Sequence, residues 1–307
     1  MSSTRLPDPD ITVQLCTYNR RSLLGCVLDA LFHQDLAPDR YEIVLVDDGS
    51  TDGTYEAVLA ALAPPCRFTL VRQRNAGLAA GRNAGILRAR GRIIVFMDDD
   101  VLATPGLLAA HLRFHERHAD AICRGAVINV ASFEQLPPPV YGMKNFSAAY
   151  FWTTNVSAPL ALVRSAGGFD ERFREYGWED LELGFRLRRR GVPSILARDA
   201  LVYHYKPPLR PTQFDGLAAQ ARAQARTARQ FLAKHPHWRI ALATGQMTPQ
   251  LWWSALTRRS GWTRLLHSIA APGEDETRLP LSIRRWAAQR FARAAYFEEL
   301  QRKRDSA

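Results

Sequence analysis

Three consecutive aspartates, Asp98, Asp99 and Asp100, directly follow an apolar run at 93–97. Adjacent carboxylates repel one another, so a bare triplet is electrostatically costly, and a bound divalent cation removes that cost. Mg²⁺ and Mn²⁺ prefer such oxygen ligands together with phosphate oxygens. The triplet therefore predicts a metal site for a phosphate-bearing ligand. A helix cap with solvated turn residues is the competing interpretation.

A second acidic pair, Asp47 and Asp48, ends the apolar run at 41–46 and precedes Gly49 and Ser50. A carboxylate at a strand end can accept the imide N–H of a nucleotide base. The same residues are also typical of a turn with Asx and N-cap hydrogen bonds. Both interpretations stay open from these residues alone.

The segment 75–83 is rich in glycine and alanine, but it has neither the Gly-Lys-Ser/Thr of a P-loop nor a well-placed GxGxxG. Arg74 and Arg82 are candidates to neutralise phosphates there. The alternative is a helix start whose small residues allow close packing.

Two glycines at 167–168 open a stretch that leads to Trp178, Glu179 and Asp180. Acidic residues at a helix start are individually ordinary. Here, however, glycines and an aromatic ring precede them, which would let a ligand approach, and one carboxylate beside a hydroxyl can act as a general base. His204 stands near a strand end, where a lone histidine is more often packed or solvated than a ligand.

Strands alternating with helices must position these residues. We expect strands at 11–16, 41–46, 68–72 and 92–97, with helices at 22–33, up to 62, and at 78–90. This repetition predicts a parallel, wound α/β sheet, in which ligands bind beyond the carboxyl ends of the strands. The polar residues at 17–19, 47–48 and 98–100 all follow such ends.

The alternation weakens beyond residue 100. We expect a helix at 106–117, a strand at 121–130, a helix at 180–190 and short strands at 194–196 and 200–205. The proline-containing stretch 131–147, which includes Lys144, is either a lid over a ligand or an exposed connection. After Pro207 and Pro208, helical periodicity recurs at 214–232, 250–266 and 281–300.

The charge is concentrated at the end of the chain. Residues 206–307 hold 18 of the 41 basic and 7 of the 30 acidic residues, so they carry the entire formal charge of +11. Trp252, Trp253 and Trp262 alternate with arginines there, and Trp286 lies among four more. Such helices suit an anionic membrane surface. Packing onto the rest of the chain, an oligomer contact or a polyanionic acceptor fits as well, whereas no nucleic-acid recognition motif is present.

Composition indicates a globular protein, with 47% hydrophobic and 23% charged residues. We find no signal peptide and no apolar run of about 18 residues, so a cytoplasmic protein is expected, with a peripheral position at the inner membrane face left open. The four cysteines form no CxxC pair and are interpreted as reduced thiols near the core: Cys16, Cys26, Cys66 and Cys123.

Five motifs, at 16–20, 46–54, 75–83, 97–100 and 167–180, stand in an order that resembles family 2 glycosyltransferases over about residues 11–205. The resemblance implies a GT-A fold, an α/β wound and mostly parallel sheet with helices on both faces, here followed by a basic α-helical C-terminal extension. Residues 1–206 would form the catalytic domain, with a nucleotide-sugar-binding half at 1–100 and an acceptor half at 101–206. The extension would occupy 207–307. Cys16 departs from the family, in which proline is more common before Thr-Tyr-Asn.

The resemblance also implies a role for each motif residue. The donor-binding set would be Thr17, Asn19, Asp47, Asp48, Arg82, Asp98, Asp99 and Trp178. Within it, Thr17 and Asp48, with Asp47 adjacent, would hold the base, Asp98 the ribose, and Arg82 would lie near the base or diphosphate. Asp100, with Asp98 and His204, would bind Mn²⁺ or Mg²⁺. Asp180 would be the catalytic base, and Glu179 would hold the sugar or acceptor.

The expected reaction is transfer of a sugar, with inversion, from a nucleotide-diphosphate sugar to an acceptor hydroxyl. A UDP-sugar is the expected donor because uridine is the commonest base of such donors. Glycan, lipid-linked, natural-product and protein acceptors all remain open. The alternatives are a nucleotidyltransferase, for which no N-terminal Gly-rich loop is found, and a non-catalytic relic that binds glycans or nucleotides.

Overall fold

The computed structural model describes residues 8–61, 63–142, 145, 147–251, 262–270 and 279–302. The chain divides into two compact units. The sheet unit comprises residues 1–174 and 179–207, and the helical unit comprises residues 175–178 and 208–307. The tetrapeptide 175–178 thus belongs to the helical unit, although the chain on both sides of it belongs to the sheet unit.

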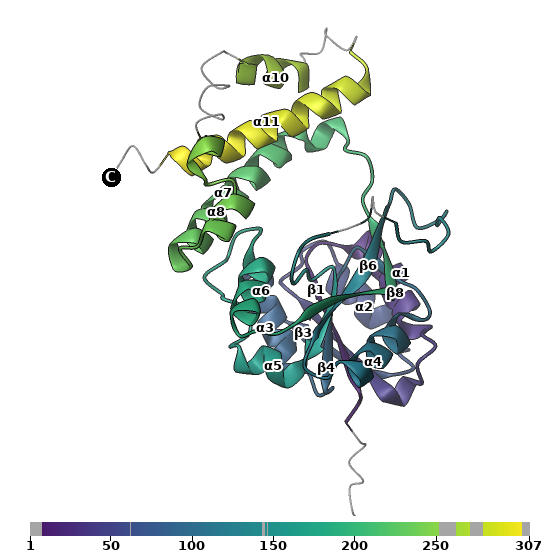
Figure 1. The fold of residues 1–307 in the computed structure, drawn as a ribbon. Helices are drawn as coiled ribbons and strands as arrows, with labels where there is room; N and C mark the ends of the chain where they lie inside the picture. Colours follow the sequence, from purple (N-terminus) through teal and green to yellow (C-terminus); the bar gives the residue numbers. More distant parts are fainter. Residues whose placement is uncertain are drawn as a thin grey trace, which may run out of the picture. The chain divides into compact units, whose positions relative to one another are not determined.

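In the part of the chain that the structure describes, the sheet unit holds eight strands in the order β3-β2-β1-β4-β7-β6-β8-β5. Figure 1 labels β1, β3, β4, β6 and β8 of this sheet. The strands are β1 (Ile11–Thr17), β2 (Tyr41–Asp47), β3 (Arg67–Arg72), β4 (Ile93–Asp98), β5 (Val101–Ala103), β6 (Ile122–Val130), β7 (Asn155–Pro159) and β8 (Ser194–Tyr205). The first four are parallel, with β1 between β2 and β4. β7 is antiparallel to β4 and β6, β8 is parallel to β6, and β5 is antiparallel to β8.

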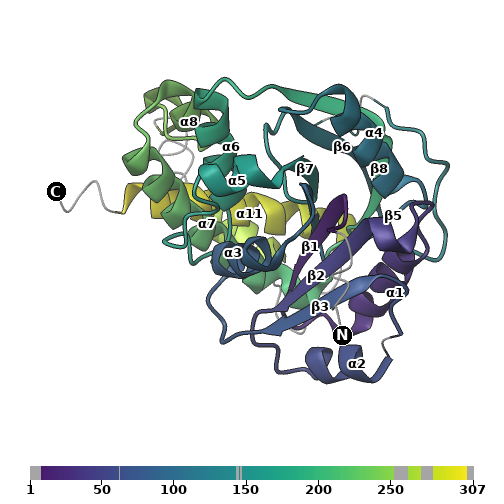
Figure 2. The same ribbon diagram turned by 90° about the horizontal axis from the view of Figure 1, so that it is seen from below.

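Helices cover both faces of this sheet (Figure 2). One face carries α1 (Arg21–Phe32), α2 (Thr54–Ala61) and α4 (Leu107–Arg117), and the other carries α3 (Leu78–Arg88), α5 (Leu160–Ser165) and α6 (Glu179–Arg189). β1 and β2 are buried along their whole length, as strands covered on both sides must be. The predicted fold class, a wound and mostly parallel sheet with helices on both faces, is confirmed.

The antiparallel half was predicted less well, because β5, β7 and α5 were not expected. The final strand was expected in two pieces, but β8 is one strand with a bulge. Its pairing with β6 steps from Gly125↔Ala197 to Ala126↔Leu201, which leaves three residues of β8 outside the ladder. A side chain on Gly125 would collide with Asn155, because a Cβ there would lie 2.1 Å from its amide.

A buried polar network holds this bulge. The Asn155 amide donates to the carbonyl oxygens of Ala126, at 3.1 Å, and Ala200, at 2.9 Å, on the two sides of the bulge. Its oxygen lies 2.9 Å from His111 Nε2, and Ser157 bridges His111 and His115 at 2.8 Å each. Burial lowers the pKa of His111 to about 4 and that of His115 to about 3. Both imidazoles are therefore neutral at physiological pH.

The helical unit is built from α7 (Phe214–Lys234), α8 (Trp238–Ala243), α10 (Trp262–Ala270) and α11 (Leu281–Gln301). The chain also has short 3-10 turns at Pro38–Arg40 and Pro211–Gln213. α8 was not expected. The predicted helix at 250–266 is described only in part, because residues 252–261, with Trp252 and Trp253, lie outside the described residues, as does Lys144 of the loop.

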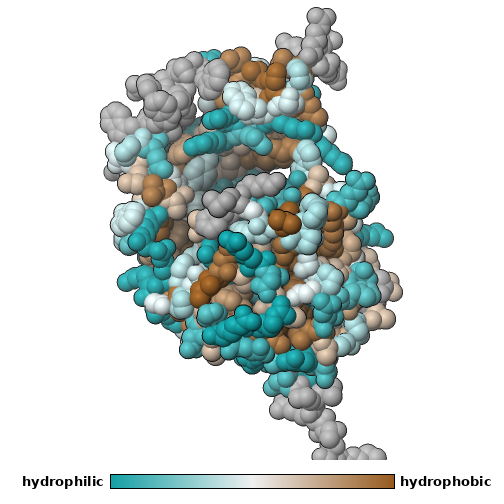
Figure 3. Space-filling view, turned by 45° about the vertical axis from the view of Figure 1, so that its right-hand side comes forward, coloured by the Kyte–Doolittle hydropathy of each residue, from teal (hydrophilic) through white to brown (hydrophobic). Residues whose placement is uncertain are grey.

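None of the helices described by the structure is long and apolar enough to span a membrane. Figure 3 shows one face of the molecule, on which hydrophobic side chains form several separate patches among hydrophilic ones.

Candidate active site

The aspartate triplet sits where β4 ends, beside the end of β1. β1 and β4 pair in parallel with Cys16 opposite Asp98, so the carboxyl ends of both strands meet at one edge of the sheet. The Thr17 hydroxyl donates to Asp99 Oδ2 at 2.8 Å. Burial is the main cause that raises the pKa of Asp99 to about 7. The predicted convergence of Thr17 with the triplet is therefore present in the structure.

Both carboxylate oxygens of Asp98 accept hydrogen bonds. The Thr154 hydroxyl donates to Oδ2 at 2.8 Å, and the Arg82 guanidinium donates to Oδ1 at 3.1 Å. In the structure Asp98 is therefore held by protein donors, and its contacts with the ribose and the cation stay predictions.

Asp100 and His204 lie together, with His204 Nε2 3.6 Å from Asp100 Oδ1. β8 places His204 opposite Val101 of β5 and opposite Asn129 of β6. Asn129 Oδ1 lies 2.9 Å from His204 Nδ1 and fixes the ring, which leaves Nε2 directed to Asp100. Burial lowers the pKa of His204, so its neutral form, the metal-ligating one, is favoured.

The chemistry of this pair fits a divalent cation, since a carboxylate oxygen and an imidazole nitrogen are both metal ligands. Among the residues that the structure describes, no three His, Cys, Asp or Glu side chains gather around one point. Asp100 and His204 would thus supply two ligands, and other ligands must come from elsewhere, as with cations held by one or two carboxylates plus substrate phosphates.

Arg82 of α3 is buried between two carboxylates. It donates to Glu179 Oε1 at 2.7 Å and to Asp98 Oδ1 at 3.1 Å, and it is 4% exposed. Burial alone would lower its pKa, but the charges of Glu179 and Asp98 outweigh burial and raise it. Arg82 therefore joins the triplet to the start of α6 in the structure, and its place beside the base or diphosphate of a donor stays a prediction.

Asp180 follows Glu179 in the first turn of α6. Among the described residues its carboxylate accepts one hydrogen bond, from the Leu181 backbone N–H at 2.6 Å. Burial, and then the negative charge of Glu179, raise the pKa of Asp180 to about 7, against the opposing effect of Arg82. A carboxylate with a pKa near neutrality is matched to proton abstraction at physiological pH.

Asp47 and Asp48 make different contacts. Asp48 accepts from the backbone N–H groups of Ala76 and Gly77 at 2.9 Å each and from Gln73 at 2.7 Å, so it anchors the loop before α3. Asp47 Oδ2 is buried without a hydrogen-bond partner among the described residues, and its nearest cation is Arg72 Nε at 3.5 Å. Of the two carboxylates predicted to hold the base, Asp47 is thus the one with an open acceptor oxygen, and the base contact itself stays a prediction.

Two further predicted residues shape loops. Asn19 has a positive φ of 54°, and its side-chain oxygen accepts from the Thr51 N–H at 2.8 Å. Trp178 also has a positive φ, of 74°, and its indole Nε1 donates to the Gln224 carbonyl at 2.9 Å. The indole N–H is thus held within the helical unit, and the predicted contact of Trp178 with the donor stays a prediction.

Sequence reasoning missed Arg20, Asn129 and Thr154. Arg20 reaches Asp99 and Asp100 at 3.4 Å each and keeps 44% of its side chain exposed. Its long side chain places a positive charge at the triplet. Its position directly after Thr-Tyr-Asn at the end of β1 was the signal that could have identified it. Asn129 and Thr154 carried no such signal, because each contacts a residue of another strand that lies far away in the sequence.

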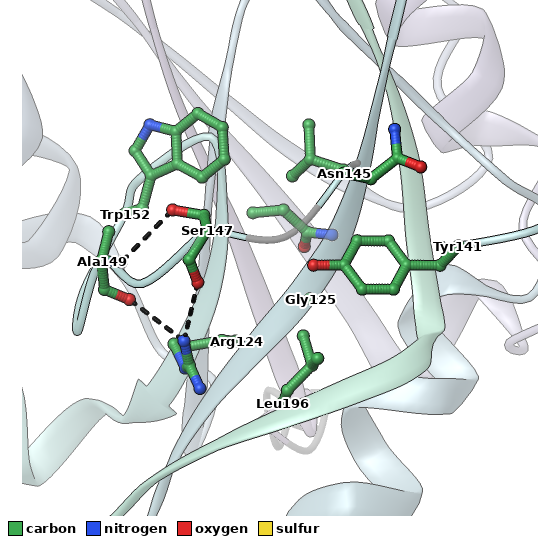
Figure 4. Close-up of a pocket in the computed structure, with 10 residues that line it drawn as sticks. Arg124, Gly125, Tyr141, Asn145, Ser147, Ala149, Trp152 and Leu196 are labelled. Carbon is green, nitrogen blue, oxygen red and sulfur yellow. Dashed lines mark hydrogen bonds between the residues drawn. The ribbon is translucent and has the colours of Figure 1, made fainter. Parts of the chain in front are cut away.

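A small pocket of about 20 Å³, room for roughly one water molecule, opens between β6, β8 and the loop before β7. Figure 4 shows Arg124 turned to the carbonyl oxygens of Ser147 and Ala149, which it contacts at 3.0 and 3.4 Å. Trp152 also lines it, and the Trp152 ring centroid lies 6.4 Å from that of His204. This pocket therefore adjoins the Asp100–His204 pair, but is too small to admit a sugar as it stands.

Solved structures with the same architecture include a mannosyltransferase and S. aureus TarS. The mannosyltransferase PcManGT from Pyrobaculum calidifontis, in complex with GDP-Man and Mn²⁺, has a TM-score of 0.60 and 20% identity over 97% of this chain and 88% of that one. Residues 1–349 of S. aureus TarS give a TM-score of 0.57 and 18% identity over 97% and 92% of the two chains. At these identities the likeness concerns the fold, which is GT-A.

Sequence comparisons give the family. Two validoxylamine A glucosyltransferases, from Streptomyces hygroscopicus subsp. limoneus and subsp. jinggangensis, are each 30% identical over 288 residues, which cover 81% of this chain. The chain spans only 60% and 64% of their lengths. The model named Glycosyl transferase family 2 matches residues 12–166, about half of the chain. The chain belongs to glycosyl transferase family 2.

Proposed function

We propose that this protein transfers a sugar, with inversion at the anomeric carbon, from a UDP-sugar to an acceptor hydroxyl, with Asp180 as general base. The observation that carries the proposal is the Arg82 bridge. Because Arg82 binds both Asp98 and Glu179, the triplet at the end of β4 and the acidic start of α6 lie at one place. A donor held at the triplet would therefore have its anomeric carbon near Asp180.

Two buried oxygens offer places for the donor and acceptor. Asp47 Oδ2 and Glu179 Oε2 have no hydrogen-bond partner in the described part of the chain. Such groups are costly unless a ligand or water completes them. Asp47 suits the imide N–H of uracil, and Glu179 suits a hydroxyl of the sugar or acceptor.

Asp100 and His204 would hold Mn²⁺ or Mg²⁺. When bound, the cation stabilises the negative charge that grows on the departing diphosphate. Arg20, exposed and within 3.4 Å of Asp99 and Asp100, would turn to the same phosphates. Solved structures support the cation and nucleotide classes, since PcManGT is complexed with GDP-Man and Mn²⁺ and TarS with UDP-GlcNAc.

The direct test is a panel of nucleotide sugars with Mn²⁺, read by slow hydrolysis of the donor and by thermal shift. A bound donor stabilises the folded state by about 2.7 kcal/mol at 100 times its dissociation constant. We expect UDP-sugars to give the largest shifts and to be hydrolysed to UDP. Shifts with nucleoside triphosphates only, accompanied by pyrophosphate release, would instead identify a nucleotidyltransferase, and binding without hydrolysis a non-catalytic relic. Because two relatives are named validoxylamine A glucosyltransferase, validoxylamine A is the first acceptor to test.

Turnover should rise with pH through neutrality. Because the pKa of Asp180 is raised to about 7, the carboxylate is largely protonated at pH 6 and ionised at pH 8, and only the ionised form accepts a proton. We expect kcat to fall about tenfold per unit below the pKa and to level off above it. A profile measured at saturating donor and Mn²⁺, with circular dichroism to show that the protein stays folded, checks this. A flat profile from pH 5.5 to 8.5 would remove Asp180 from the base role.

We also propose that α11 contacts an anionic membrane surface. Ile283 and Trp286 are each 43% exposed, and Arg290 and Arg293 are exposed at the following turns of the same helix face. Arg290 lies over the Trp286 ring at 5.8 Å, so an apolar ring and cations occur side by side. An oligomer contact through the same face is the alternative.

Sedimentation with liposomes tests the membrane contact. Binding to vesicles with about 30% anionic lipid should fade between 50 and 500 mM salt, since charge attraction is screened over about 10 Å at 0.1 M. Trp286→Ala should weaken binding severalfold. Binding that is independent of anionic lipid, or a dimer by light scattering that Trp286→Ala breaks, would contradict a membrane role.

A further inference from the structure

The tetrapeptide before the catalytic pair belongs to the helical unit. Residues 175–178 group with the C-terminal helices, whereas Glu179 and Asp180 begin α6 in the sheet unit. Trp178 of the helical unit is therefore joined by a peptide bond to Glu179 of the sheet unit. Glu179 and Asp180 are the residues that the proposed function places at the reacting atoms.

Contacts from α7 hold this tetrapeptide by its backbone and by its indole. The Thr227 hydroxyl lies 3.1 Å from the Tyr176 carbonyl oxygen and shares its proton with the carbonyl oxygens of Gln224, at 3.0 Å, and Ala223, at 3.3 Å, of its own helix. Trp178 Nε1 donates to the Gln224 carbonyl at 2.9 Å. The Trp178 ring packs with Phe231, at 6.5 Å between ring centroids, and against a buried cluster that includes Ala225 and Ala228. Arg226 of the same helix pairs with Glu175 at 2.8 Å.

The backbone of the tetrapeptide is in an unusual conformation. Gly177 has φ 99° and Trp178 has φ 74°, a left-handed region that bulky L residues rarely adopt. A Cβ on Gly177 would lie 3.0 Å from the Gln224 side chain. Such a conformation persists only where its surroundings enforce it. The hydrogen bonds to the tetrapeptide come from α7, and the cluster behind the Trp178 ring also includes residues of α11.

We infer that α7 positions Asp180, through Trp178 and Thr227, by enforcing the left-handed turn that leads into α6. The inference rests on the proposed function of Asp180 as base. Trp178 and Thr227 are positioning residues, and neither needs to touch a substrate. Because a displacement of about 1 Å can cost about 100-fold in rate, a loosened turn lowers turnover more than it lowers donor affinity.

Conservative substitutions separate positioning from substrate contact. Trp178→Phe keeps an aromatic ring and removes the indole N–H, and Thr227→Val keeps the shape and removes the hydroxyl. Thr244→Val is the matched control, since Thr244 is also buried in the helical unit and its hydroxyl donates to the Ile240 carbonyl at 2.7 Å. Thr244 makes no contact with the tetrapeptide among the interactions described.

We expect kcat to fall at least tenfold in Trp178→Phe and in Thr227→Val, with the dissociation constant for UDP and Mn²⁺ within twofold of wild type by calorimetry. The midpoint of the pH profile should also shift in both, because the surroundings of Asp180 change. Thr244→Val should retain wild-type kcat. Amide exchange at 176–181 should accelerate in Thr227→Val and not in Thr244→Val.

Three outcomes would overturn the inference. Thr227→Val with wild-type kcat would do so, as would loss of activity in Thr244→Val equal to that in Thr227→Val. A rise in acceptor KM alone in Trp178→Phe would mean that the indole contacts the substrate instead. If the wild-type protein turns over no nucleotide sugar, the proposed function fails, and amide exchange still reports whether α7 holds the turn.

Discussion

Asp180→Asn should lower kcat by about 10² to 10⁴, the range typical for loss of a general base. Asparagine has the shape of aspartate but cannot accept the acceptor's proton, so the chemical step loses its base while the fold is kept. Donor affinity should stay within about threefold, because the triplet, Arg82 and the Asp100–His204 pair are unchanged. Single-turnover kinetics with a radiolabelled donor would measure the chemical step directly.

Asp120→Asn is a suitable control, since Asp120 is exposed in the turn after α4 and the same chemical change there should leave kcat unaltered. The residual rate of Asp180→Asn should also lose the rise with pH through neutrality. Turnover within tenfold of wild type, or an unchanged pH profile, would show that another group accepts the proton.

Asp100→Ala should abolish the Mn²⁺-dependent part of donor binding. Asp100 supplies the carboxylate of the only described Asp–His pair at the triplet, 3.6 Å from His204 Nε2. Changes to groups that merely support metal ligands already cost about 10- to 100-fold in metal affinity, so removal of a ligand should cost at least that much. Calorimetric titration with UDP, with and without Mn²⁺, measures the difference.

His204→Gln should give a smaller loss of the same kind, and Asp39→Ala, at an exposed aspartate of the first 3-10 turn, should give none. If Asp100→Ala binds UDP as tightly as wild type in the presence of Mn²⁺, and the wild type gains nothing from Mn²⁺, then the pair holds no cation during catalysis.

The fold could be predicted from sequence for those elements whose own residue pattern identifies them. β1, β2 and β4 are mostly apolar because both of their faces are covered, although β1 and β2 also bury polar residues such as Gln14 and Glu42. α1 repeats its apolar residues at helical spacing. β7 was missed because Asn155 and Ser157 are polar residues in a buried strand. Their partners, His111 and His115, lie more than 40 residues away, and sequence alone does not show that the pairing exists.

The candidate site was also predictable only in part, for the same reason. The carboxylates could be identified because they follow predicted strands or begin a predicted helix. Their partners could not, since Arg82 meets Glu179 across 97 residues and Thr17 meets Asp99 across 82. Trp178 was assigned to a ligand because an aromatic residue beside glycines suits one, whereas the nearest carbonyl to its indole N–H is on α7.

The number of residues in the β8 bulge determines whether His204 lies beside Asp100. Three residues between Ala197 and Leu201 lie outside the ladder, and only with them does His204 fall opposite Asn129. Deleting one of them would either force a tighter bulge or, if the pairing after the bulge slips by one residue, move His204 to the other face of the strand, because side chains alternate along it. Arg198 and Asp199 of the bulge are exposed and should accept substitutions, whereas Ala200 is buried in the core. Insertions and deletions should be rejected at all three positions, so the length of the bulge is a more specific signature than its composition.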